Sequence, residues 1–61
     1  MSIKLHDIVQ VHIDSYYEYN VPYVVLDYTE DNVALMTMKD GMIIEICDWH
    51  DGDIYVRDFS V

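Results

Sequence analysis

The dipeptide Asp40-Gly41 is the feature of this sequence that most constrains its fold. An Asp-Gly pair between two apolar segments is a strong signal for a β-hairpin, because both residues tolerate the positive φ angles of tight hairpin turns. The segment before it, Val33 to Met38, also contains Ala, Leu and Met residues that favour a helix. The segment after it, Met42 to Cys47, has the apolar character of a returning strand. We therefore predict a pair of strands here rather than a helix.

Three further segments have the pattern of short β-strands. Asp7 to Asp14 alternates, with apolar residues on one face and Gln10 and His12 on the other, which predicts a half-buried strand. Tyr23 to Tyr28 is rich in β-branched and aromatic residues, and Ile54 to Phe59 alternates again. The polar and aromatic residues 15–20 predict a loop. We expect five short antiparallel strands in a single domain, residues 1–61.

The order of these segments resembles that of SH3-like small β-barrels of the KOW or Tudor type. The matching features are a first strand that opens with an acidic turn (Leu5 to Val11), a longer loop, three meandering strands with the Asp40-Gly41 hairpin, and a short last strand. The resemblance covers most of the chain and implies an all-β fold, a five-stranded antiparallel SH3-like small barrel. Such barrels commonly serve as docking modules, but the resemblance transfers no binding residue to this sequence.

The charge balance excludes several functions. Twelve carboxylates and three Lys and Arg side chains give a formal net charge of −9. Phosphate recognition depends on clustered Lys and Arg, so we expect no direct nucleic-acid binding and no attachment to an anionic membrane. Yet 52% of the residues are hydrophobic, which is too many for a disordered acidic tail. A folded acidic domain that binds another protein, most simply a basic one, fits both properties.

The sequence offers little support for catalysis, metal binding or a bilayer span. Its apolar runs are far shorter than a transmembrane helix, its N-terminus lacks a secretory pattern, and its lone Cys47 forms no disulfide framework, so we expect a cytoplasmic protein. Cys47 and His50 are three residues apart and would point to opposite faces of a strand. The loop around Gly52 lacks the early carboxylates of a calcium-binding loop, and Gly52 instead suits a turn with positive φ. We predict no enzyme activity, no metal site and no cofactor.

Tyrosines and carboxylates supply the candidate partner-binding residues. Tyrosine rings provide rigid contact area with a polar tip, although some of those in the first loop could instead fold back over the core. The carboxylates form two groups in the sequence, one before the middle of the chain and one after the fourth strand. The predicted contact set is Tyr16, Tyr17, Glu18, Tyr19, Asp27, Glu30, Asp31, Asp48, Trp49, Asp51 and Asp53.

Strands two to four carry apolar residues at both odd and even positions. One parity holds Tyr23, Val25, Leu35, Ile43 and Cys47, and the other holds Val24, Leu26, Met36, Met38, Met42, Ile44 and Ile46. An antiparallel sheet with one solvated face should alternate more strictly. We infer that a partner protein or a second copy in a homodimer covers one face; the alternative is ordinary exposed apolar atoms.

Our preferred hypothesis is a non-catalytic acidic protein–protein interaction module that inhibits or regulates a basic partner. A first alternative is a DNA mimic that inhibits a nucleic-acid enzyme, as a small phage-encoded effector would. Spread over roughly 4,100 Å², the carboxylates average about one per 340 Å², against roughly one charge per 100 Å² of duplex DNA. Mimicry therefore requires clustering. A second alternative is a small structural homo-oligomer with no dedicated ligand.

Overall fold

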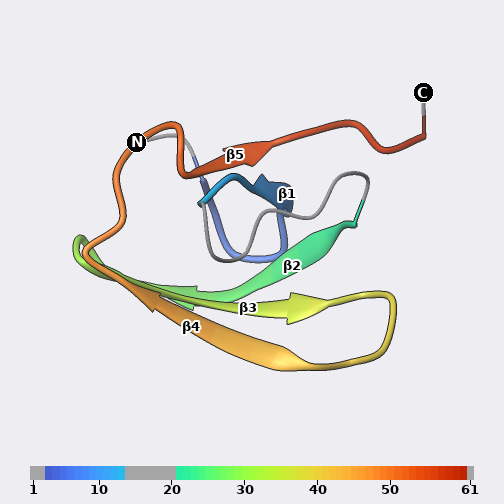
Figure 1. The fold of residues 1–61 in the computed structure, drawn as a ribbon, viewed down its shortest axis with the longest axis horizontal. Coiled ribbons are helices and arrows are strands. Elements are labelled where there is room, and N and C mark those ends of the chain that lie inside the picture. Colours follow the sequence, from blue (N-terminus) through green and yellow to red (C-terminus); the bar gives the residue numbers. More distant parts are fainter. Residues whose placement is uncertain (1–2, 14–20, 61) are drawn as a thin grey trace.

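The computed structural model describes residues 3–13 and 21–60. These residues form five β-strands and one antiparallel sheet with the strand order β4-β3-β2-β1-β5 (Figure 1). The strands are β1 (Ile8–Val11), β2 (Tyr23–Tyr28), β3 (Asn32–Thr37), β4 (Ile43–Cys47) and β5 (Ile54–Val56). The predicted all-β class and the five antiparallel strands are confirmed, and the segment that could have been a helix is β3.

The sheet is open, whereas the sequence predicted a small barrel. Within the described residues, β4 and β5 are the two edges of the sheet and do not pair with each other. The predicted last strand, Ile54 to Phe59, is also shorter, because β5 ends at Val56. β5 has three residues and pairs with β1, and no strand pair among residues 3–13 and 21–60 closes the sheet.

A bend in the sheet creates the core. In Figure 1, β1 and β5 lie above the layer formed by β2, β3 and β4. The register of β2 with β3 shifts between Val25 and Asp27. Bulges of this kind bend a strand and increase its twist. The largest fully buried side chains lie between the two layers and come from β1, β2 and β3: Leu35, Val9, Val11, Val25 and Val33.

The predicted hairpin at Asp40-Gly41 is confirmed, with a four-residue loop. The N–H of Thr37 donates to the carbonyl of Met42 (2.9 Å), and the N–H of Gly41 donates to the carbonyl of Thr37 (3.0 Å). Gly41 has a φ of 76°, which its missing side chain permits. The carboxylate of Asp40 accepts a hydrogen bond from the Met42 N–H (3.0 Å). The loop thus satisfies its own backbone and fixes the register of β3 against β4.

That loop changes which residues share a face. Because Thr37 pairs across a four-residue loop with Met42, odd-numbered residues of β3 lie opposite even-numbered residues of β4. Leu35 pairs with Ile44, and Met36 pairs with Ile43. The grouping of Ile43 with Leu35 by parity was therefore wrong. Apolar residues do occupy both faces, but Ile43 belongs to the face opposite the core.

The C-terminal residues cover one polar position that we expected to be solvated. Gln10 is only 2% exposed, although it lies on the predicted polar face of β1. Its side-chain oxygen accepts a hydrogen bond from Arg57 (2.7 Å), whose guanidinium lies 4.8 Å from the centre of the Phe59 ring. Near the C-terminus, the hydroxyl and the N–H of Ser60 both donate hydrogen bonds to the Asp58 carboxylate, and these bonds lower the pKa of that carboxyl. Both faces of β1 are therefore covered at Gln10.

Candidate protein-binding surface

The face of the sheet turned away from the core carries a row of apolar side chains. The strand register places Ile8 opposite Val24, Val24 opposite Met36, and Met36 opposite Ile43. Directly paired residues of antiparallel strands have side chains on the same face and close together. Ile43 is 60% exposed and Ile8 is 38% exposed, while Val24 and Met36 are half-buried. We call these four residues the apolar row; it runs from β4 across the sheet to the bend at β1.

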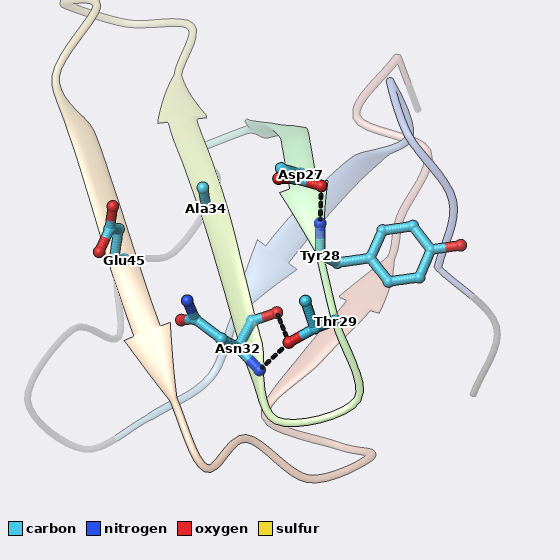
Figure 2. A pocket seen from close by; sticks show the side chains of 6 residues that line it. All are labelled: Asp27, Tyr28, Thr29, Asn32, Ala34 and Glu45. Atoms are coloured by element: carbon cyan, nitrogen blue, oxygen red, sulfur yellow. Dashed lines mark hydrogen bonds between the residues drawn. The ribbon is translucent and has the colours of Figure 1, made fainter.

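A second row on the same face is acidic. Asp27 of β2 pairs with Ala34 of β3, and Ala34 pairs with Glu45 of β4. Figure 2 shows the two carboxylates on either side of the small Ala34 side chain. We call these three residues the carboxylate row. It lies next to the apolar row, because Ala34 and Met36 are two residues apart in β3, as are Glu45 and Ile43 in β4.

The carboxylate row contains a shallow depression of about 100 Å³. Its lining residues are Asp27, Tyr28, Thr29, Asn32, Ala34 and Glu45 (Figure 2). Pockets for small-molecule ligands usually measure about 300–1,000 Å³. This depression is therefore suited to one polar or charged side chain of a partner rather than to a cofactor or substrate.

The two acidic groups of the sequence meet at one end of the sheet. The N–H of Asp48, just after β4, donates to the carbonyl of Asp31 in the β2–β3 turn (2.6 Å). Glu30 and Asp51 are exposed in the same two connections. We call these four residues the acidic end. The backbone hydrogen bond thus places one residue of each acidic group side by side, in two loops rather than on a continuous face.

The loop that carries Asp48 is held by its own hydrogen bonds. Asp48 has a φ of 57° and Gly52 a φ of 97°, the latter in agreement with the turn predicted there. The carboxylate of Asp53 accepts a hydrogen bond from the backbone N–H of His50 (2.8 Å). The backbone carbonyl of Asp53 accepts one from the backbone N–H of His12 (2.6 Å). The carboxylate of Asp53 therefore stabilises the loop itself, and the backbone carbonyl of Asp53 joins the loop to the residue that follows β1.

The structure divides the predicted contact set into four parts. Asp53 is half-buried, and its carboxylate accepts a hydrogen bond within its own loop. Asp27, Glu30, Asp31, Asp48 and Asp51 are exposed. Trp49 is 4% exposed and belongs to the core, so very little of its surface is available to a partner. Tyr16, Tyr17, Glu18 and Tyr19 lie outside the described residues.

Several surface residues were absent from the predicted contact set. They are Ile8, Val24, Met36, Ile43 and Glu45. Most of them could have been predicted from the apolar residues at both odd and even positions of strands two to four. Only the register between strands shows that they form one row.

The described residues give no sign of a metal centre or a bilayer span. Among residues 3–13 and 21–60, no group of three His, Cys, Asp or Glu side chains is placed to hold a metal ion. No helix in this part of the chain is long and apolar enough to cross a membrane. Comparison of the chain with protein-family models, curated proteins and solved structures found no match.

Proposed function

We propose that this protein is a non-catalytic acidic module that binds a basic partner protein through the outer face of β2, β3 and β4. The observation that carries the proposal is the apolar row, which lies beside the carboxylate row. Contiguous apolar patches that exceed a few hundred Å² and are rimmed by polar residues are uncommon on monomeric proteins and mark interaction sites. The meander of β2, β3 and β4 with its Asp40-Gly41 hairpin, followed by the short last strand β5, supports the resemblance to SH3-like docking modules.

In this proposal the two rows have different tasks. The apolar row supplies the desolvated centre of the interface, where most of the binding energy of protein complexes arises. Asp27 and Glu45 attract Lys or Arg side chains of the partner and fix its position along the strands. Binding would inhibit or regulate the partner by occupying its basic surface, and we propose that this takes place in the cytoplasm.

The test is a comparison of two single substitutions in a capture experiment. The Ile43→Ser variant removes the most exposed side chain of the apolar row, and Val56→Ser removes a 50% exposed apolar side chain from β5. Burial of one such side chain contributes about 1.5–3 kcal/mol. We therefore expect Ile43→Ser to weaken capture of basic proteins from a lysate of the source cells at least about tenfold. Val56→Ser should bind like the wild type. Equal capture by all three proteins would contradict the proposal.

A second candidate function, DNA mimicry, is favoured by the acidic end. The backbone hydrogen bond between Asp48 and Asp31 places an acidic residue from each of two loops side by side, where both would face a basic DNA-binding groove. The same capture experiment separates the candidates when duplex DNA and salt are added. A mimic should be displaced by DNA, should lose affinity steeply with salt and should be weakened by the Asp31→Asn/Asp48→Asn double variant. Binding that resists DNA and depends on Ile43 supports the interaction module instead.

A further inference from the structure

At one edge of the sheet, backbone groups of β4 form no hydrogen bond to another strand of the part of the chain that the structure describes. Hydrogen bonds from Thr37 to Met42 and from Asp48 to Asp31 mark the two ends of the β3–β4 pair. Residues of an antiparallel strand alternate between those that bond to the neighbour and those that point away from it. Ile44 and Ile46 therefore bond to β3, whereas Ile43, Glu45 and Cys47 direct their N–H and C=O groups outward. Within the described residues, no strand lies beyond β4.

This edge has few of the features that prevent strand pairing. Natural edge strands are often protected by proline, lysine, bulges or very short length. β4 has five residues, with no proline and no lysine, and the register shift of the sheet lies in β2. Its single charged residue is Glu45, at the centre of the strand. Among residues 3–13 and 21–60, no strand occupies this edge, and Glu45 is the charged side chain of β4 that a pairing strand would meet.

The charge of Glu45 disfavours a second copy of this chain. If β4 paired antiparallel with β4 of another copy about its centre, the two Glu45 side chains would lie directly opposite each other. Like charges in that position destabilise a strand pair, and each chain carries a net charge of −9. A strand with Lys or Arg directly opposite Glu45 would instead be stabilised, because opposite charges in that position attract.

We propose that β4 binds an extended segment of the basic partner by β-strand addition, with a Lys or Arg opposite Glu45. Main-chain hydrogen bonds to Ile43, Glu45 and Cys47 would supply affinity, and the alternating side chains would supply selectivity. The partner residues opposite Ile43, Ile44 and Ile46 would be apolar. Ile43 is exposed on the outer face, and Ile44 and Ile46 lie on the core face, where Ile46 is 7% exposed and borders a hollow also lined by Ile13 and Trp49. The inference rests on the proposed function and specifies the chemistry of the partner segment.

The first test uses two capped, fluorescently labelled peptides in an anisotropy titration. One contains Thr-Val-Lys-Val-Ile, which places Lys opposite Glu45 in an antiparallel pair, and the other has Glu in place of Lys; both have Gly and Ser flanks. We expect the Lys peptide to bind about three- to tenfold more tightly than the Glu peptide. The Glu45→Lys variant should reverse this preference. Failure of the Lys peptide to bind saturably at millimolar concentration, or an unchanged preference in Glu45→Lys, would overturn the proposal.

The second test separates backbone pairing from charge. Glu45→Pro removes an outward N–H that β3 does not use, which edge strands tolerate, whereas Glu45→Gln keeps that N–H and removes the charge. We expect Glu45→Pro to lose at least tenfold in affinity for the Lys peptide, and Glu45→Gln to lose less. If Glu45→Pro does not fold, Ile43→Pro at the first strand position, compared with Ile43→Val, makes the same test. Binding that survives a folded proline variant would overturn strand addition.

The two proposals can fail separately. If Ile43→Ser loses protein capture while a folded Glu45→Pro variant keeps it, the outer face is the binding surface and strand addition at the β4 edge is wrong. If the proline variants lose peptide binding while Ile43→Ser keeps protein capture, strand addition stands and the apolar row is not the binding surface.

Discussion

Replacing Trp49 by alanine should lower the free energy of unfolding by about 3–5 kcal/mol. This loss is comparable with the whole stability of a domain of 61 residues, about 3–9 kcal/mol. Trp49 is 4% exposed and joins the β4–β5 connection to the core formed by the sheet, so its removal leaves a large cavity. Urea unfolding followed by far-UV circular dichroism measures the effect without depending on tryptophan fluorescence.

Trp49→Phe is the matched control for this prediction. The indole Nε1 of Trp49 is buried and has no hydrogen-bond acceptor among the described residues. Phenylalanine therefore retains most of the apolar volume and gives up no hydrogen bond seen in the structure. We expect its cost to be less than half that of alanine. An alanine variant as stable as the wild type would place Trp49 outside the core and return it to the candidate contact residues.

Leu35→Ala and Ile43→Ala should differ strongly in their cost, because the two residues lie on opposite faces of the sheet. Leu35 is fully buried at the centre of β3, and truncating such a side chain costs about 2–5 kcal/mol. Ile43 is 60% exposed on β4, so its truncation should cost under about 1 kcal/mol, mainly from lost strand propensity. Equal losses in the same urea experiment would show that the faces have been assigned wrongly.

Local signals were sufficient to predict where the five strands lie, although β5 ends earlier than the predicted strand. The Asp40-Gly41 dipeptide, flanked by apolar segments, gave the β3–β4 hairpin and decided between strand and helix for residues 33–38. Gly52 indicated the turn before β5, and the alternation around Val9 and Val11 indicated β1. Each of these signals depends on residues close together in the sequence, where backbone preference and apolar alternation determine the structure.

The arrangement of the faces depended on contacts that no local pattern contains. Because of the four-residue loop, odd-numbered residues of β3 pair with even-numbered residues of β4, so Ile43 lies on the outer face. Trp49 stands in a polar run that is typical of an exposed loop, yet tertiary packing turns its ring inward. The hydrogen bond between Asp31 and Asp48 likewise joins residues that are far apart in the sequence. The strand order, which leaves β4 and β5 at the edges of the sheet, also depends on pairing between distant segments.

The most direct test of the binding surface is amide hydrogen exchange with and without the Lys peptide, read residue by residue by NMR. We predict that the peptide slows exchange of the Ile43, Glu45 and Cys47 amides, and that the Glu peptide at the same concentration does so much less. Protection confined to Glu30, Asp31 and Asp51, with β4 unchanged, would contradict the assignment of binding to β4 and the outer face and would favour the acidic end.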